Sequence, residues 1–303
     1  MQAPRRAVNP PALDAHAMRY CGREFTLPEI DIIRRLIAEH PLATRARLSQ
    51  LVCERLDWRR ADRRLKEMSC RVVMLRMQDD GLLHLPAPRH RHHNGQPYRR
   101  RTPQGNPEPT LQCASPKQLG DILLQPVLDR GESHLWNEYI DRYHYLGYQP
   151  LPGAQMRYFA RAAGRIIALL GFGASAWMTQ PRDLFIGWTA EQRQQRLHLV
   201  VNNSRFLVLP WIKCKNLASR ILGMASRRLA NDWQPRYGYR PVLLETFVEV
   251  PRFSGTCYHA ANWIHLGQTK GRGKLEVANK FLLPKKAIWV YPLHKNFRQL
   301  LCG

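Results

Sequence analysis

The stretch VLLETFVEVPRFSGTCYHAANWIHLG, residues 242–267, carries the clearest structural signal in the chain. Residues 242–250 are largely apolar, with two alternating sets of side chains, a pattern that is typical of a buried strand. Residues 256–263 form a short amphipathic run, and residues 264–268 return to a strand pattern. The stretch therefore predicts a strand, a short helix and a second strand in quick succession.

The sequence on either side extends this arrangement into an α/β domain. Alternating apolar and polar residues predict strands, and apolar residues at helical spacing predict helices. The expected elements are a helix over 131–148, a hairpin of 155–162 and 165–174 turning at Ala163-Gly164, a strand over 198–209, a long helix over 216–233 and a closing strand over 287–291.

This order of elements resembles the core of the GNAT acyltransferases over residues 157–273. The spacing of Gly255, Tyr258 and Trp263 is similar to a helix of the phage Mom-like DNA-modifying branch, with Ala261 shifted by one position. The resemblance implies that acyl-coenzyme A would lie between splayed central strands, with its pyrophosphate at the N-terminus of the long helix. The chain departs from the family pattern at 210–216, PWIKCKN, where the usual glycine loop is missing.

Three longer blocks point to a second family. They are YHYLGYQPLPGAQMRYF at 143–159, LHLVVNNSRFLVLPW at 197–211 and LLETFVEVPRFSGTCYHAANWIHLGQTKGRG at 243–273. Together with a basic helical N-terminal region, they resemble the DruA family of the Druantia anti-phage defence system over nearly all of the chain from Thr26. The resemblance implies a role in defence or in a mobile element, with other defence proteins as partners.

The N-terminal part predicts a helical domain over 23–88 that follows a basic flexible arm, 1–22. Thr26-Leu-Pro-Glu29 is a helix start with a capping box, and His40-Pro41 ends that helix. A second helix is expected over 45–56. A third is expected to begin near Trp58 and to turn Leu65, Met68 and Val72 inward, with a turn and a short strand over 77–85.

That order is typical of a winged helix-turn-helix, whose third helix enters the major groove of DNA. The alternative is a small helical bundle that contacts protein through a solvated arginine face. The cations expected to contact nucleic acid are Arg59, Arg60, Arg63, Arg64, Lys66 and Arg71. The fold class is therefore α+β, with a winged-helix-like helical domain followed by a GNAT-like mixed α/β domain over 118–303.

A linker rich in Pro, His and Arg is expected between the two domains, over 89–117. Its arginines Arg99, Arg100 and Arg101 are further candidate phosphate contacts. Its histidines are a possible metal tract or, as the alternative, part of a basic tether: His90, His92 and His93.

Charge is the main compositional signal. The chain has 47 Lys and Arg against 23 Asp and Glu, a formal net charge of +24. Such an excess attracts polyanions, and nucleic acid, DNA in the first place, is the expected partner; an arginine-rich coding bias is the alternative. No apolar run is long enough to span a membrane and the N-terminus lacks a signal peptide, so we expect a cytoplasmic protein. The seven cysteines are scattered, which predicts reduced thiols.

Carboxylates, a tyrosine and a histidine are the candidate catalytic groups. Glu245 and Glu249 lie four residues apart on a predicted strand and so share one face, as a general base with its partner or as ligands of a divalent metal. The alternative is an ion pair with Arg165 or Arg252. A metal site needs a third carboxylate, for which the candidates are Asp183 and Glu276.

Tyr258 is the candidate acid for a departing thiolate, a role that the GNAT resemblance implies, and His259 is a candidate proton shuttle. Either side chain is alternatively part of the packed core. Asn202 and Asn203 lie within a predicted strand and are candidates to bind a base edge or a substrate carbonyl, or else they mark a bulge. The remaining candidate phosphate contacts form a basic loop: Lys270, Arg272 and Lys274.

The sequence thus leaves three functions open. The first is a DNA-binding component of a defence system or mobile element. The second is a nucleobase-modifying acyltransferase with acyl-coenzyme A as cofactor. The third is a nuclease or transposase-like strand-transfer enzyme that depends on Mg²⁺. Whether the protein is an enzyme, and which of the two cofactors it would use, stays open at this point.

Overall fold

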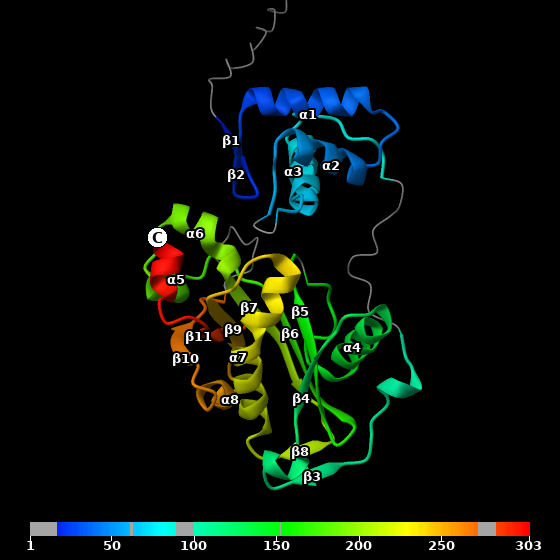
Figure 1. The fold of residues 1–303 in the computed structure, drawn as a ribbon. Helices are drawn as coiled ribbons and strands as arrows, with labels where there is room; N and C mark the ends of the chain where they lie inside the picture. The colour runs from blue at the N-terminus through cyan, green and yellow to red at the C-terminus, as the bar shows by residue number, and fades with distance from the viewer. Residues whose placement is uncertain (1–16, 61–62, 89–99, 152, 272–282) are drawn as a thin grey trace, which may run out of the picture. The chain divides into compact units, whose positions relative to one another are not determined.

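The computed structural model describes residues 17–60, 63–88, 100–151, 153–271 and 283–303. The chain divides into two compact units, Met1–His93 and Asn94–Gly303 (Figure 1). Each unit has its own hydrophobic core, and we describe each by itself.

The N-terminal unit combines a small hairpin with helices. Strands β1 (Met18–Tyr20) and β2 (Arg23–Phe25) pair antiparallel, and helices α1 (Leu27–Glu39), α2 (Arg45–Arg55) and α3 (Glu67–Asp79) follow. Thr26 and Glu29 form the expected capping box at the start of α1. The buried core includes Phe25, Ile30, Ile33, Val52 and Met74.

The third helix of this unit differs from the expectation. It begins at Glu67 rather than near Trp58. Of the residues between, 58–60 and 63–66 are described and form no helix, with a β-bridge between Arg59 and Leu65. The side chains of Met68 and Val72 are 66% and 39% exposed, because other residues hold the inward positions instead: Cys70, Val73, Met74 and Met77.

The expected turn is present directly after this helix, at Asp80 and Gly81, but the expected strand before residue 85 is absent from the described residues. Helix α3 continues to Asp79, and residues 80–88 contain no strand. The unit's hairpin precedes its first helix and starts at Met18, inside the region expected as a flexible arm. The structure therefore shows a helical unit with an N-terminal hairpin, without the strand order of a wing.

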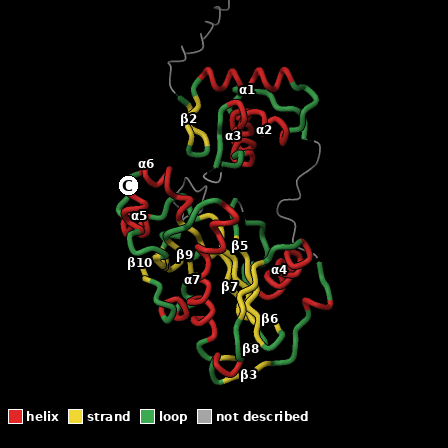
Figure 2. The backbone as a smooth tube through the Cα atoms, viewed as in Figure 1, coloured by secondary structure: helices red, strands yellow, loops and turns green. Residues whose placement is uncertain are grey.

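The C-terminal unit is built on a seven-stranded mixed sheet with the order β10-β11-β9-β7-β6-β5-β4 (Figures 1 and 2). All neighbours are antiparallel except β7 and β9, which are parallel. The strands are β4 (Leu123–Pro126), β5 (Met156–Ala162), β6 (Arg165–Ala174), β7 (Val200–Val208), β9 (Leu243–Glu249), β10 (Ile264–Gln268) and β11 (Lys286–Pro292).

The order expected from the sequence is present in this unit. Ala163 and Gly164 turn the β5–β6 hairpin with φ of 48° and 72°. The long helix α7 (Leu217–Tyr237) joins the parallel strands β7 and β9, and the short helix α8 (Thr256–His259) joins β9 to β10. A mixed α+β fold with the expected order of strands and helices is confirmed.

Helices cover both faces of the sheet. On β5, Arg157 donates to Asn137 and Ser133 of helix α4 (Arg130–Tyr143), whereas the hydroxyl of Tyr158 donates to Asp232 of α7. Because adjacent residues of a strand point to opposite faces, α4 and α7 lie on opposite sides of the sheet.

Three short helices that the sequence pattern did not indicate lie on the side of the unit where the chain ends. They are α5 (Gln180–Ile186), α6 (Ala190–Arg196) and α9 (Phe297–Cys302). Ile186 and Phe297 pack against Leu243 and Val290 of the sheet in a satellite cluster.

Residues 100–117, expected as part of a linker, belong to the C-terminal unit. Strand β3 (Leu111–Cys113) pairs parallel with β8 (Ile212–Cys214). The backbone N–H of Thr102 donates to the carboxylate of Glu138 at 2.7 Å, and its hydroxyl donates at 2.8 Å. Glu138 is buried on α4, so its carboxylate needs these hydrogen-bond donors. The proline-rich composition of residues 100–117 predicted a linker because it does not indicate this contact. No helix among the described residues is long and apolar enough to cross a membrane.

Candidate functional site

The two parallel strands at the centre of the sheet separate and open a cavity. Strands β7 and β9 pair only over Val200–Asn202 and Leu243–Glu245, although β7 continues to Val208 and β9 to Glu249. The gap beyond the pairing is a cavity of about 510 Å³. Its walls come from the end of α4, from both strands and from residues 252–258.

A β-bulge on β7 shapes one wall of this cavity. Gly171 of β6 pairs with Arg205, and Phe172 pairs with Asn203, so Ser204 is the extra residue. The side chains of Asn203 and Ser204 both donate to the carbonyl oxygen of Gly171, each at 3.2 Å. A regular strand would send these neighbours to opposite faces, whereas the bulge gathers them on one side. The bulge that the sequence offered as the alternative for the asparagines is present, directly after Asn203.

Asn203, Thr246 and Tyr258 form a hydrogen-bonded cluster in the cavity. The Tyr258 hydroxyl donates to Asn203 Oδ1 at 2.8 Å, and the Thr246 hydroxyl donates to the Asn203 carbonyl oxygen at 2.9 Å. Burial raises the pKa of Tyr258, so its phenol stays protonated. The structure therefore brings together two of the residues singled out in the sequence, Asn203 and Tyr258.

Aromatic and basic side chains that the sequence pattern did not single out line the opening. The guanidinium of Arg252 lies 4.5 Å from the ring centroid of Tyr145 and 5.8 Å from that of Phe253. The rings of Tyr145 and Phe253 are 5.1 Å apart. Burial, together with the charges of Arg205 and Arg252, lowers the pKa of His144 to about 4. The sequence signal was Arg252-Phe253 directly after the strand, a basic and aromatic pair in a turn.

Glu245 and Glu249 do not form the expected pair of carboxylates. Glu245 is fully buried and accepts from Arg182 Nη1 at 2.9 Å and from the backbone N–H of Ala176 at 2.8 Å. Glu249 is half-buried and lies opposite Lys286 on β11. The ion-pair alternative therefore applies to Glu245, but its partner is Arg182 and not Arg165 or Arg252. Arg165 pairs with Glu108.

The surroundings of Glu245 do not fit a divalent cation. Arg182 bonds both Glu245 and Asp183, so a fully buried positive charge already stands between the two carboxylates. The described residues contain no group of three or more His, Cys, Asp or Glu side chains arranged for a metal ion. Glu276 and the histidines His90, His92 and His93 lie outside the described residues.

Two other candidate residues, His259 and Asn202, do not line the cavity. His259 is exposed, with its ring 6.4 Å from Trp289, and does not line the cavity. Asn202 pairs with Glu245 in the parallel ladder, and its side-chain oxygen is buried with no hydrogen-bond partner among the described residues.

The candidate phosphate contacts occupy several surfaces. Arg63 and Arg64 are exposed in the loop before α3, and Arg59 pairs with Asp57 in the same loop. Three further candidates are half-buried: Arg60, Lys66 and Arg71. Arg100 and Lys270 are exposed, and Arg101 pairs with Asp141. The remaining candidates lie outside the described residues: Arg99, Arg272 and Lys274.

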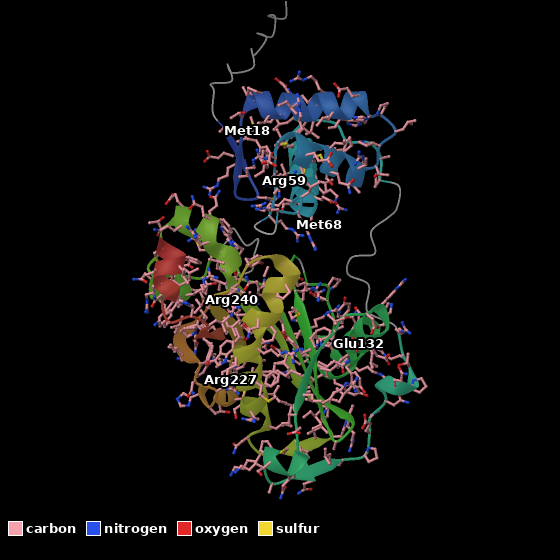
Figure 3. All side chains as sticks on the ribbon, in the orientation of Figure 1. Met18, Arg59, Met68, Glu132, Arg227 and Arg240 are labelled. Carbon is pink, nitrogen blue, oxygen red and sulfur yellow. The ribbon has the colours of Figure 1, made fainter. Side chains whose placement is uncertain are left out.

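A second cavity, of about 810 Å³, lies at the N-terminal half of α7. Lys117, Arg220 and Arg227 line it with exposed side chains, and Arg227 lies on α7 (Figure 3). The glycine-free segment before α7 is held as strand β8, which turns into the helix at Asn216 with φ of 63°. Cationic side chains rather than a loop of backbone N–H groups therefore offer donors that fit phosphate in this cavity, which Asp121 also lines.

Solved structures similar to this chain are acetyltransferases. Polyamine N-acetyltransferase from Drosophila melanogaster is 14% identical with a TM-score of 0.36, over 57% of this chain and 100% of that one. A GNAT-family acetyltransferase from Streptococcus pneumoniae is 11% identical with a TM-score of 0.37, over 57% and 100%. The ribosomal-protein-S18-alanine N-acetyltransferase from Escherichia coli is 8% identical with a TM-score of 0.35, over 58% and 98%. Likeness at this level says nothing about the activity of this chain.

Sequence comparison is more specific about the family. No curated protein is similar to the chain. The family model of the Druantia protein DruA, in contrast, matches residues 76–283. The match covers well over half of the 303 residues and includes both central strands and the cavity between them. The chain therefore belongs to the DruA family of Druantia proteins.

Proposed function

We propose that this protein is a nucleic-acid-binding component of a Druantia system, with DNA as its partner. The observation that carries the proposal is the net charge of +24. A positive field of this size draws in polyanions over a distance of about one Debye length, and phosphate contacts then supply most of the affinity.

Exposed cations of both units support the proposal. In the N-terminal unit, Arg63 and Arg64 are exposed in the loop that leads into α3. In the C-terminal unit, Lys117, Arg220 and Arg227 surround the cavity beside α7. Asp121 also lines this cavity, but within the described residues none of the latter three cations forms an ion pair.

The test is the salt dependence of binding to labelled duplex and single-stranded DNA. Replacing Arg63 and Arg64 with alanine is expected to weaken binding and to reduce the slope of log K against log salt by about 2, since each lost phosphate contact removes about 1. The matched control replaces Arg35 and Arg47, two exposed arginines of α1 and α2, and removes the same charge. Equal effects of the two double variants would assign the binding to overall charge and not to the loop.

Acyl transfer to a nucleobase is the second candidate. The separation of β7 and β9 and the buried hydroxyl of Tyr258 at their gap favour it. Lys117, Arg220 and Arg227 would hold the pyrophosphate of acyl-coenzyme A, which supplies an activated acyl group when bound. Isothermal titration with acetyl-coenzyme A and mass spectrometry of recovered DNA test this function. A bound cofactor and an acyl mass gain on a base would support it.

A Mg²⁺-dependent reaction at Glu245 is not proposed, because the guanidinium of Arg182 occupies the position where the cation would have to bind.

A further inference from the structure

We propose that the cavity between β7 and β9 binds one unpaired nucleobase, and that it favours bases that carry an exocyclic amino group. The inference rests on the proposed nucleic-acid binding and specifies which part of the ligand this cavity takes. Its volume of about 510 Å³ lies within the range of small-molecule sites and holds a base with its sugar.

Aromatic rings at the opening provide a surface on which a base can stack. Phe253 is 44% exposed although it is a large apolar side chain, and its ring lies 5.1 Å from that of Tyr145 at an angle of 59°. Proteins that bind single-stranded nucleic acid use exposed aromatic rings and arginine planes in this way. Arg252 lies over both rings, at 4.5 Å and 5.8 Å from their centroids, and adds a cation beside the stacking surface.

The charge at the opening suits the phosphate that accompanies a nucleotide. Arg252 lines the opening, Arg205 lies between the lining residues Ser204 and Phe206, and neither arginine forms an ion pair within the described part of the chain. His144 lies beside them and is neutral at physiological pH, because burial and the two arginines lower its pKa to about 4. Its Nδ1 accepts from the N–H of Leu146 at 3.2 Å, so the proton is on Nε2, which is left as a donor.

The interior of the cavity presents acceptors. The hydroxyl hydrogens of Ser204 and Thr246 are used toward the carbonyl oxygens of Gly171 and Asn203, and that of Tyr258 is used toward Asn203 Oδ1. A hydroxyl that donates its hydrogen still offers oxygen lone pairs, so the oxygens of these side chains face a ligand as acceptors.

The amide of Asn203 is committed in the same way. Its Nδ2 donates to Gly171 and Arg205 carbonyl oxygens at 3.2 Å and 3.1 Å, so both of its hydrogens are used. A ligand edge with N–H donors matches this set of oxygens. Adenine and cytosine carry an exocyclic amino group that supplies two such donors, whereas thymine has no amino group and offers a single ring N–H between two carbonyl oxygens.

The experiment measures binding of dAMP, dCMP and dTMP to the full-length protein by isothermal titration. We expect dAMP and dCMP to bind about tenfold more tightly than dTMP, as for a site that loses a buried hydrogen bond with the wrong base. Arg252→Ala and Phe253→Ala change exposed residues and should weaken all three nucleotides by about tenfold. Ser204→Ala should reduce the preference for dAMP over dTMP and leave dTMP binding unchanged.

Three results would overturn the inference. The first is equal affinity for the three nucleotides in the unaltered protein, and the second is no binding of any of them. The third is dAMP binding that Arg252→Ala and Phe253→Ala leave unchanged, which would place the nucleotide elsewhere. The Arg63→Ala and Arg64→Ala double variant separates this test from that of DNA binding as such. It should weaken duplex binding and keep dAMP affinity, so loss of one property without the other identifies which proposal fails.

Discussion

At the scale of single residues, Arg182 is the clearest case of a side chain whose role depends on the fold. Its guanidinium and the carboxylate of Glu245 are both fully buried, 2.9 Å apart. The sequence indicated that Glu245, in an otherwise apolar strand, needed a partner. It could not indicate which of the many arginines that partner is, because the contact joins residues 63 positions apart in the chain.

Arg182→Met is expected to destabilise the protein by about 3–5 kcal/mol, because it leaves the carboxylate of Glu245 buried without its cation. Urea denaturation measures the loss. Arg193→Met is the control, since Arg193 lies on the neighbouring helix and contacts Asp183 at 3.4 Å with its side chain partly exposed. A loss below about 1 kcal/mol for Arg182→Met would mean that water reaches Glu245 in the folded protein.

His144 predicts a pH dependence of stability. Its pKa is about 4 in the folded protein against an ordinary value of 6.5, so the unfolded chain takes up the proton first as the pH falls. Stability should therefore drop between about pH 6.5 and pH 4, by up to about 1.4 kcal/mol per pH unit, and this contribution should level off below.

The groups that face His144 are Arg205, Arg252 and the stacked ring of Tyr145. His144→Gln should remove this part of the slope, and His259→Gln, which changes an exposed histidine, should not. Urea midpoints measured across this pH range provide the comparison. An unchanged slope in His144→Gln would contradict the assignment.

At the scale of elements, the position of α8 depends on Gly255. This glycine has a φ of 73°, and a Cβ built on it would lie 2.8 Å from Trp289 Nε1. Gly255→Ala therefore combines an unfavourable backbone conformation with a clash against a buried ring. Gly164 has a φ of 72° but no atom within 4 Å of such a Cβ, so Gly164→Ala isolates the conformational effect.

We expect Gly255→Ala to lose about 1–3 kcal/mol more stability than Gly164→Ala, and to displace Tyr258 from Asn203. Thermal unfolding and the NMR signals of the Tyr258 ring would report the two effects. Equal losses for the two variants would show that Trp289 moves aside without cost.

Elements with a long and regular apolar pattern could be predicted from the sequence, and short ones could not. The β5–β6 hairpin, α7 and the capped start of α1 follow the expectations to within a few residues. The helices α5, α6 and α9 have six or seven residues each, too few for a period to show. For α3 the sequence predicted the wrong buried face, because Cys70 and Met77 hold core positions that more typical apolar residues usually fill.

At the scale of the whole molecule, the two units have separate cores. The N-terminal core and the two clusters of the C-terminal unit share no residue. We expect residues 94–303 to fold without the N-terminal unit and to unfold at the same temperature as the corresponding transition of the full chain. Calorimetry of the fragment and the full chain tests this. A fragment that is unfolded or clearly less stable would show that the cores depend on each other.

The candidate site was only partly predictable. Asn203 and Tyr258 stood out because polar or aromatic residues interrupted an apolar pattern, and the structure brings them together. Arg252 and Phe253 did not stand out, because a loop has no period against which a residue can be unusual. His144 and Tyr145 were placed inside the helix expected over 131–148, whereas the helix ends at Tyr143. Their grouping is a property of the tertiary fold, set by where α4 ends and where the chain leaves β9.

The bulge at Ser204 has a consequence for how this site tolerates sequence change. The extra residue fixes the register of β7 against β6, because a shift in register would move the bulge away from Gly171. Removing Ser204 altogether would restore regular alternation and rotate one half of the strand, exchanging the inner and outer side chains of Asn203 and its neighbours. The site is thus more sensitive to the number of residues in β7 than to the replacement of any one of them, and relatives with a one-residue insertion or deletion here should differ in what the cavity accepts.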